Sequence, residues 1–172
     1  MQADFEIDIL THSIEDVATG ESFPTLVLPL VKADLKQASK KDGWKFNWKT
    51  ELNNPEKQVF KLVIERRAAV IQGLVSLAID TGYVEMHLLE IAPFNFGSNK
   101  VYRGVAGNLV AYVCKVSFEQ GFDGYIGFTA KTKLMEHYRQ TLGAVHIGGH
   151  RMSVRTDEAK ILVNKYFPDF SI

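Results

Sequence analysis

Apolar residues recur at helical spacing between positions 101 and 121. The members of this apolar face are Val105, Leu109, Tyr112, Val113 and Val116. Gly121 stands where a helix commonly ends, because glycine readily adopts the left-handed conformation of a helix C-cap. The pattern therefore predicts an amphipathic helix that starts in the small residues around Gly104 and ends near Gly121.

Strand-like runs lie on both sides of this predicted helix. Residues 59–65, 69–79 and 83–92 are rich in aliphatic and aromatic side chains and predict three strands of an antiparallel meander. Gly82 lies in the turn between the last two of these strands, where glycine tolerates a positive φ. Residues 123–130 predict a further strand after the helix.

The remaining segments predict shorter elements. Residues 5–10 alternate apolar and acidic side chains, which indicates a half-buried strand. Residues 23–31 are apolar but contain Pro24 and Pro29, which argues against a central strand. Four further ranges predict two short helices (33–41 and 134–142), a last strand (151–155) and a final amphipathic helix (157–167).

The composition limits the classes of partner. The 20 basic and 20 acidic residues leave no net charge, so we expect no nucleic-acid partner. One cysteine among 172 residues rules out an internal disulfide framework. The start of the chain lacks the basic and apolar regions of a signal peptide, and no apolar run is long enough to span a membrane. We therefore expect one cytoplasmic domain over residues 1–172, without a membrane partner.

Residues 44–49 interleave aromatic side chains with lysines and allow three interpretations. Such a pattern can stack on the bases of single-stranded nucleic acid. It can also be a strand or loop whose aromatic rings pack on one face while the lysines extend to solvent. The absence of net charge favours this second interpretation. A third is that the aromatic rings form a wall of a substrate pocket.

The small residues at the start of the predicted helix indicate an anion site. The first amides of a helix lack intrahelical partners, and the positive end of the helix dipole lies there. An anionic group can approach these amides closely where side chains are small, and Arg103 lies beside them. A Rossmann dinucleotide site is excluded because Ala106 stands at the second glycine position and the strand ends about ten residues earlier. A P-loop is excluded because Asn108-Leu109 follows Gly107 where Lys-Ser/Thr is required.

This stretch resembles the GNAT (Gcn5-related N-acetyltransferase) superfamily. That family places Gly-x-Gly/Ala at a helix start, with aliphatic residues one, five and six positions after the first glycine. Gly104-Val105-Ala106 followed by Leu109-Val110 has this spacing. The order of elements also fits over residues 58–155: a meander ending at Pro93, the helix, a strand, and a second helix that closes at Gly143-Ala144.

The resemblance implies an α/β (α+β) fold with a mixed, mostly antiparallel sheet flanked by helices. It implies N-acetyltransferase activity with acetyl-CoA as co-substrate, no metal, and a small-molecule or peptide amine as acceptor. A homodimer remains open, and the alternative is a non-catalytic CoA-binding or protein-interaction module on the same fold. Backbone groups of Glu90, Ile91 and Ala92 would bind the pantetheine arm. The residues that would surround the pyrophosphate are Arg103, Gly104, Val105, Ala106, Gly107 and Asn108.

The resemblance also implies candidate catalytic residues. Tyr138 would be the general acid that protonates the leaving thiolate, although it lies five residues before Gly143 where the family usually has four. The base would be Glu85 or Glu90, which strand alternation places on opposite faces unless a bulge intervenes. The structural alternatives are that Tyr138 packs in the core and that a glutamate pairs with Arg66 or Arg67. His146, His150 and Cys114 invite a metal site, but the glycines between the two histidines prevent a shared helical face.

Overall fold

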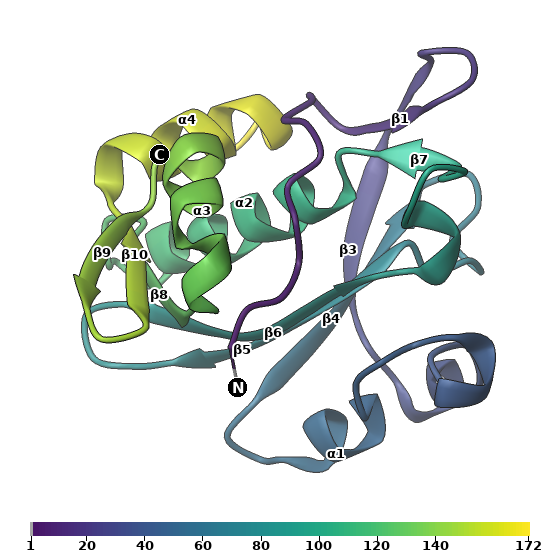
Figure 1. Cartoon of the computed structure of the whole chain (residues 1–172), viewed down its shortest axis with the longest axis horizontal. Helices are drawn as coiled ribbons and strands as arrows, with labels where there is room; N and C mark the ends of the chain where they lie inside the picture. The colour runs from purple at the N-terminus through teal and green to yellow at the C-terminus, as the bar shows by residue number, and fades with distance from the viewer. Residues whose placement is uncertain (1) are drawn as a thin grey trace.

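Seven strands form one sheet with helices on both faces in the computed structural model, which describes residues 2–172 (Figure 1). The strand order is β3-β4-β5-β6-β8-β10-β9, and among these described strands only β6 and β8 pair in parallel. The strands are β3 (Thr25–Pro29), β4 (Gln58–Ile64), β5 (Gly73–Ile79), β6 (Val84–Ile91), β8 (Ile126–Thr129), β9 (Val145–Gly148) and β10 (Arg151–Val154). The predicted α/β fold with a mixed, mostly antiparallel sheet is confirmed.

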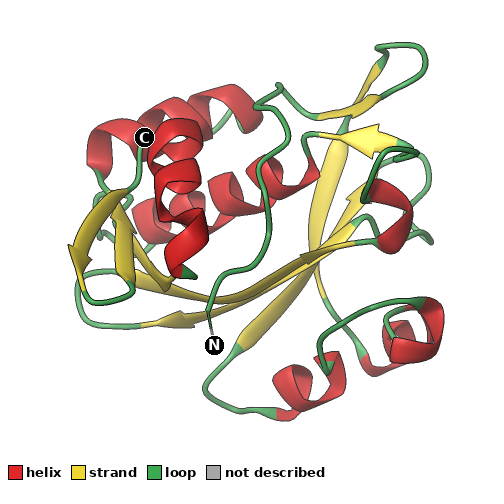
Figure 2. Cartoon of the chain, viewed as in Figure 1, coloured by secondary structure: helices red, strands yellow, loops and turns green. Residues whose placement is uncertain are grey.

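Three longer helices cover one face of the sheet and shorter ones cover the other (Figure 2). The first group is α2 (Val105–Glu119), α3 (Met135–Leu142) and α4 (Thr156–Tyr166). The second group is η1 (Lys32–Gln37), η2 (Lys40–Asp42) and α1 (Trp48–Asn53), and the one-turn helices η3 (Pro93–Asn95) and η4 (Thr132–Leu134) lie in connections. Each face buries a separate hydrophobic cluster, so the sheet is the central layer.

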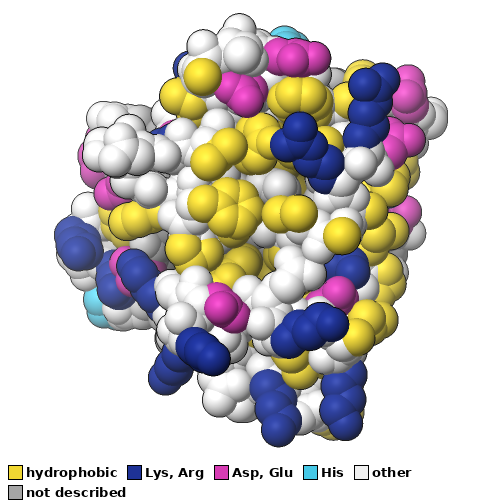
Figure 3. Space-filling model, turned by 90° about the vertical axis from the view of Figure 1, so that its right-hand side faces the viewer, with side chains coloured by type: hydrophobic (Ala, Val, Ile, Leu, Met, Phe, Trp, Pro, Cys, Tyr) yellow, Lys and Arg dark blue, Asp and Glu magenta, His cyan; other side chains and the backbone are white. Residues whose placement is uncertain are grey.

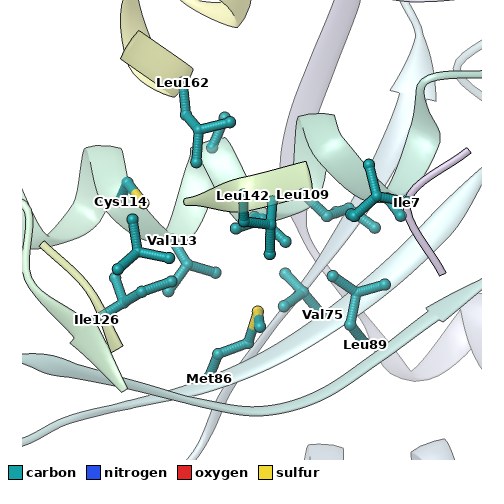
Figure 4. Packing of buried hydrophobic residues seen from close by; sticks show 14 of the residues in the cluster. Ile7, Val75, Met86, Leu89, Leu109, Val113, Cys114, Ile126, Leu142 and Leu162 are labelled. Carbon is teal, nitrogen blue, oxygen red and sulfur yellow. The ribbon is translucent and has the colours of Figure 1, made fainter. Parts of the chain in front are cut away.

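The helix α2 is buried on nearly all sides because it lies between the sheet and α4. Figure 4 shows Leu109 and Val113 among sheet side chains such as Val75, with Leu162 of α4 on the other side of the helix. Burying each Leu or Val side chain contributes about 1.5–3 kcal/mol, so this layer contributes substantially to stability. The helix is thus buried more completely than the single predicted apolar face implied, and Tyr112, a member of that face, is only half-buried.

A small second sheet joins the beginning of the chain to the segment before α2. Its strands are β2 (Ser22–Phe23), β1 (Ile14–Asp16) and β7 (Tyr102–Arg103), in the order β2-β1-β7. The sequence pattern did not predict this sheet, because two- and three-residue strands carry too few positions to show a period. Its effect is to hold the chain immediately upstream of Gly104 in place.

A β-bulge changes the faces of β6. Ser76 lies opposite Leu88, but its neighbour Leu77 lies opposite Met86, so His87 is an extra residue on β6. Such a residue shifts the alternation of side chains by one position. Glu90 consequently lies on the same face as Glu85, and the opposite faces predicted from strict alternation are wrong.

Other expectations need correction near the start of the chain. Residues 5–10 form no strand; their alternation is real, because Phe5 and Ile7 are buried, but the segment is an extended connection. Residues 33–41 form two short 3-10 turns rather than one helix. The predictions for 134–142, 151–155 and 157–167 are confirmed within one or two residues, whereas β9 was missed. No helix in residues 2–172 is long and apolar enough to span a membrane.

Candidate functional site

The strands β6 and β8 separate along their length and leave an edge of β6 unpaired by β8. They pair only at Val84–Ile126 and Glu85–Gly127, although β6 continues to Ile91. A cavity of about 400 Å³ opens beside this edge. Its lining comes from Leu89–Ile91 of β6, from Val105 and Ala106 of α2, from residues 4–8, and from segments within 43–46 and 93–100. The cavity therefore touches both the predicted pantetheine segment and the predicted pyrophosphate segment.

The helix start behind this cavity is packed against the chain itself. Gly104 has a φ of 83°, and a Cβ there would collide with Thr11 Oγ1 and approach the Ser13 carbonyl oxygen. A Cβ at Gly107 would lie 2.6 Å from the Tyr166 hydroxyl oxygen. Glycine at these two positions therefore lets Thr11, Ser13 and Tyr166 pack closely against the helix start. Of the residues of α2, only Val105 and Ala106 line the cavity.

Two acidic side chains hold the cationic groups near the helix start. Arg103 forms an ion pair with Glu15 at 3.0 Å and does not line the cavity. Lys100 lines the cavity and pairs with Asp8 at 3.1 Å. Asp8 also accepts a hydrogen bond from the Gly104 amide at 3.2 Å. The predicted anion site thus has a carboxylate of the same chain on one of its amides.

Three further residues predicted to bind the donor are Asn108, Ala92 and Ile91, and the first two are hydrogen-bonded to other parts of the protein. The Asn108 side chain is fully buried and its amide nitrogen lies 3.3 Å from Thr25 Oγ1, which ties α2 to β3. The Ala92 amide donates to the Gln72 carbonyl oxygen at 2.9 Å. Ile91 lines the cavity and lies opposite Gly73 in the sheet. Of these three, Ile91 alone faces the cavity.

Tyr138 lies next to the cavity but is covered. Its side chain is fully buried, and its hydroxyl donates to the Phe5 carbonyl oxygen at 2.5 Å. Its ring packs against those of Phe5 and Phe128 at centroid distances of 5.0 and 5.5 Å. Burial raises the pKa of Tyr138 well above its ordinary value, so the phenol keeps its proton at neutral pH. Phe5 lines the cavity, whereas Tyr138 does not.

Glu90 lines the cavity, and three N–H groups hold its carboxylate. The backbone amides of Lys45 and Phe46 donate to it at 2.6 and 3.2 Å, and the Trp48 indole donates at 2.9 Å. A carboxylate has about four lone-pair sites, so roughly one remains free. Glu90 therefore fastens the segment 44–48 to β6 and can still accept one further hydrogen bond from the cavity side.

Glu85 lies away from Glu90 and the cavity. It forms a two-pronged ion pair with Arg151, with nitrogen–oxygen distances of 2.7 and 2.5 Å, and it does not line the cavity. Five residues along a strand correspond to roughly 16 Å, so Glu85 and Glu90 do not share one site. The pairing partner is Arg151 from β10, rather than Arg66 or Arg67, the partners expected from the sequence.

The structure adds a histidine that was not among the predicted site residues. His87 Nδ1 lies 2.6 Å from Glu51 Oε1 of α1, 36 positions away in the chain. A carboxylate on one ring nitrogen fixes the orientation of an imidazole. His87 borders a small pocket beside Phe5 and Phe46. Its place on the β6 strand was visible in the sequence, but nothing in the local pattern pointed to Glu51.

The structure places the three aromatic residues of segment 44–48 in two different surroundings. Trp44 and Trp48 are buried in the cluster under the sheet, whereas Phe46 lines the cavity. The Lys45 ammonium lies 5.1 Å from the centroid of the exposed Phe96 ring. Lys and Arg side chains gather at the lower end of the face in Figure 3, the level at which Figure 1 shows α1 and the short helices before it.

The remaining chemical candidates lie away from the cavity. Cys114 is fully buried in α2, and burial raises the pKa of its thiol. His146 Nε2 lies 2.7 Å from the Gly149 carbonyl oxygen, and His150 lies 3.3 Å from Thr132 Oγ1. Across residues 2–172, no group of three or more His, Cys, Asp or Glu side chains is arranged to hold a metal ion.

Comparisons with known proteins identify the fold. No protein-family model and no curated protein matches the sequence. Three similar solved structures are a mutant of the AtaT toxin bound to the C-terminus of the antitoxin AtaR and acetyl-CoA, the N-acyl amino acid synthase FeeM from uncultured soil microbes, and a chimera of the spermidine N-acetyltransferase SpeG from Vibrio cholerae and hSSAT. Their TM-scores are 0.57, 0.55 and 0.53, and their identities are 14%, 15% and 16%.

The likeness extends over most of each chain. The three alignments cover 80%, 81% and 80% of this chain, and 97%, 94% and 98% of the respective neighbours. At these low identities, the likeness concerns the path of the chain rather than the individual site residues. The chain therefore has the fold of the GNAT acetyltransferase superfamily.

Proposed function

We propose that this protein is an N-acetyltransferase that moves an acetyl group directly from acetyl-CoA to an amine. The observation that carries the proposal is the cavity beside the unpaired edge of β6, which reaches from Leu89–Ile91 to the start of α2. An extended pantetheine arm can pair with a free strand edge, and a helix start can receive a pyrophosphate. The two features adjoin one cavity, as one elongated donor molecule requires.

The donor would use few residues of this chain. Backbone groups of Leu89–Ile91 would bind the pantetheine arm, and the amides of Val105 and Ala106 would receive the pyrophosphate. Lys100, which lines the same cavity, would supply the positive charge nearest to it. Gly104 and Gly107 support this role indirectly, since their lack of a side chain lets Leu10–Ser13 and Tyr166 pack behind the helix start.

The chemical step requires two proton transfers. The amine nitrogen bonds to the thioester carbonyl carbon and loses a proton, while the carbon–sulfur bond breaks and the sulfur takes a proton. Tyr138 is our candidate for the acid that protonates the sulfur, because it is adjacent to the cavity and keeps its phenolic proton. Glu90 is our candidate for the base, acting through water with its remaining lone pair. Glu85 was the other carboxylate expected, and its pairing with Arg151 favours a structural role.

The acceptor would approach from the α1 side of β6. Glu90, His87 and Phe46 face that side, and the Glu90 carboxylate and the Phe46 ring suit an amine group. Spermidine is named for the SpeG neighbour, and FeeM is named as an N-acyl amino acid synthase. A polyamine and free amino acids are therefore the first small molecules to test, followed by a peptide with a free N-terminus.

The test is a panel of acceptors incubated with acetyl-CoA. The panel holds spermidine, amino acids, a lysine-containing peptide, an amine-bearing antibiotic and an aminoacyl-tRNA. Release of the CoA thiol is followed with a thiol reagent, and the product is identified by mass spectrometry as the acceptor plus one acetyl group. Acetylation of any acceptor supports the proposal. Tight CoA binding without acetylation of any class would favour the non-catalytic CoA-binding module instead.

A further inference from the structure

The segment Ala3–Asp8, called the strap below, runs along the cavity from the end of β8 to the start of α2. In Figure 1 it is the purple segment that passes beside α3 on its way to β1. It belongs to no strand of either sheet. Its path connects the two ends of the proposed donor site, because residues 4–8 line the cavity throughout.

The first part of the strap occupies the open edge of β8. The Ala3 amide donates to the Thr129 carbonyl oxygen at 2.5 Å, and the Lys131 amide donates to the Ala3 carbonyl oxygen at 3.3 Å. Ala3 thereby forms an isolated parallel bridge with Ala130. These bonds fill backbone groups at the point where β8 has separated from β6.

The middle of the strap is hydrogen-bonded to two side chains of α3. The Phe5 carbonyl oxygen accepts a hydrogen bond from the Tyr138 hydroxyl, and the Ile7 amide donates to His137 Nε2 at 2.8 Å. Phe5 and Ile7 are 8% and 4% exposed. Figure 4 shows Ile7 pointing into the same cluster as Leu89 of β6 and Leu109 of α2.

The last residue of the strap neutralises the cationic end of the site. The Asp8 carboxylate accepts from the Gly104 amide and pairs with Lys100, the two groups at the start of α2 that an anion would seek. Glu6 adds a negative charge to the lining of the same cavity, whereas Asp4 is paired with Lys131. Lys45 also lines the cavity. A pyrophosphate entering at the Asp8 end would meet the Asp8 and Glu6 carboxylates and a lysine that is already paired, so the closed arrangement opposes an anionic donor there.

We infer that the strap is a tethered competitor of the acyl donor, and that CoA binds when the strap leaves the cavity. The inference rests on the proposed function, because it takes the cavity to be the donor site. Asp8 holds Lys100, the positive charge proposed for the pyrophosphate, and the Gly104 amide next to the proposed Val105 and Ala106 amides. Phe5 holds the hydroxyl of the proposed acid. One movement of the strap would therefore free the phosphate end and the catalytic end of the site together.

The ionic contacts of the strap are weak, whereas its middle residues Phe5 and Ile7 are buried in the core cluster and become exposed when the strap opens. The Asp8 and Lys100 side chains are 23% and 25% exposed, and the Asp4–Lys131 pair is also partly exposed, so water and salt weaken both pairs. The next residue, Ile9, is 46% exposed. For a ligand that binds only the open form, the measured affinity equals the affinity of the open form multiplied by the fraction of molecules that are open. Weakening the strap should accordingly strengthen CoA binding without any new contact to CoA.

The first experiment compares two charge-neutralising substitutions in the strap. Asp8→Asn removes the charge that pairs with Lys100 and weakens the bond to the Gly104 amide. Glu6→Gln is the matched control: it removes the same charge from the same cavity, and Glu6 is exposed. Titration calorimetry with CoA should show a gain in affinity of about tenfold or more for Asp8→Asn, and a much smaller gain for Glu6→Gln. Equal gains for the two variants would overturn the inference, because CoA affinity would then follow the total charge of the cavity rather than the contacts of Asp8.

The second experiment follows the strap itself. Chymotrypsin cleaves after Phe5 only when that residue is exposed, and ligands normally protect a protein against proteases. CoA should instead accelerate cleavage at Phe5 in the full chain, with hydrogen exchange of residues 3–8 rising in parallel. Unchanged or slower cleavage at a CoA concentration that saturates the protein would overturn the inference. The two readouts do not require the protein to have any catalytic activity.

Deleting the strap distinguishes a failure of the strap inference from a failure of the proposed donor site. CoA binding is compared among three proteins: the full chain, a chain lacking residues 2–8, and Asp8→Asn. Circular dichroism verifies that each is folded. If the deletion does not fold, the comparison of Asp8→Asn with the full chain decides the question. Tighter binding after strap removal supports the inference. Equally tight binding by all three overturns the strap as competitor and leaves the donor site standing. No binding by any folded form would overturn the proposed donor site, and the inference with it.

Discussion

The Tyr138 hydroxyl donates its hydrogen bond to the backbone of Phe5, so the proposed general acid is held by the strap. Tyr138→Phe should therefore have two effects of opposite sign. Turnover of an identified acceptor should fall by roughly 10²–10⁴-fold, the usual contribution of general acid catalysis. CoA affinity should stay equal or rise a few-fold, because the strap loses one bond. Steady-state kinetics and calorimetry measure the two quantities.

Tyr112→Phe is the matched control for this substitution. Tyr112 lies on α2 and packs against Phe60 at a centroid distance of 5.0 Å, and it does not line the cavity. Its hydroxyl should be dispensable for both turnover and binding. If Tyr138→Phe retains the parent rate, the sulfur is protonated by water or by the acceptor, and the catalytic assignment on α3 is wrong.

Glu90→Gln should lower the free energy of unfolding by about 1–3 kcal/mol. The carboxylate accepts three N–H bonds from residues 45, 46 and 48, and a glutamine would place its own NH₂ donors against one of them. Urea denaturation measures the loss, and Glu65→Gln on an exposed side chain is the control. A change below about 0.5 kcal/mol, the range typical of surface substitutions, would mean that these bonds contribute little.

The two glycines with the same backbone conformation offer a direct comparison at the helix start. Gly104 and Gly97 have φ values of 83° and 84°, but a Cβ at Gly97 meets nothing within 4 Å. Gly97→Ala should cost about 1–2 kcal/mol from the left-handed conformation alone. Gly104→Ala should cost more, because it also displaces Thr11. Similar losses for both variants in thermal or urea unfolding would contradict the packing described for Thr11.

Cys114 should be unreactive in the native protein. It is the single cysteine of the chain, it is fully buried in α2, and burial raises the pKa of its thiol, so little thiolate is present. A thiol reagent should label it only after denaturation, and the release of CoA should then be measurable without background from the protein. Rapid labelling in native buffer would indicate that α2 separates from the sheet far more often than its packing implies.

The sequence by itself determined the elements that depend on neighbouring residues. The period of the apolar residues from Val105 to Val116 located α2, and the runs before and after it located β4, β5, β6 and β8. Their order, together with Gly104-Val105-Ala106, was enough to predict the fold that the structure confirms. These signals are readable because apolar runs bounded by turn residues, and apolar residues at helical spacing, are properties of neighbouring positions in the chain.

Only the tertiary structure decided which distant groups meet. The period of β6 predicted opposite faces for Glu85 and Glu90, but the register against β5 makes His87 a bulge and brings both to one face. Arg103 was expected to face an anion, and instead it pairs with Glu15. Such outcomes depend on pairings between remote segments, which leave no periodic trace in either partner.

The strap shows most clearly what the local sequence predicts and what only the folded chain decides. The alternation of Phe5 and Ile7 with acidic residues correctly indicated one buried side, and it predicted a strand because alternation alone does not specify a partner. Its actual partners, Tyr138 and Gly104, lie 133 and 96 positions away from the residues that bind them. The local pattern therefore determined which side chains of the segment are buried. The folded chain decided that they are buried in the core beside the cavity, where β6 and β8 separate and leave backbone groups unpaired.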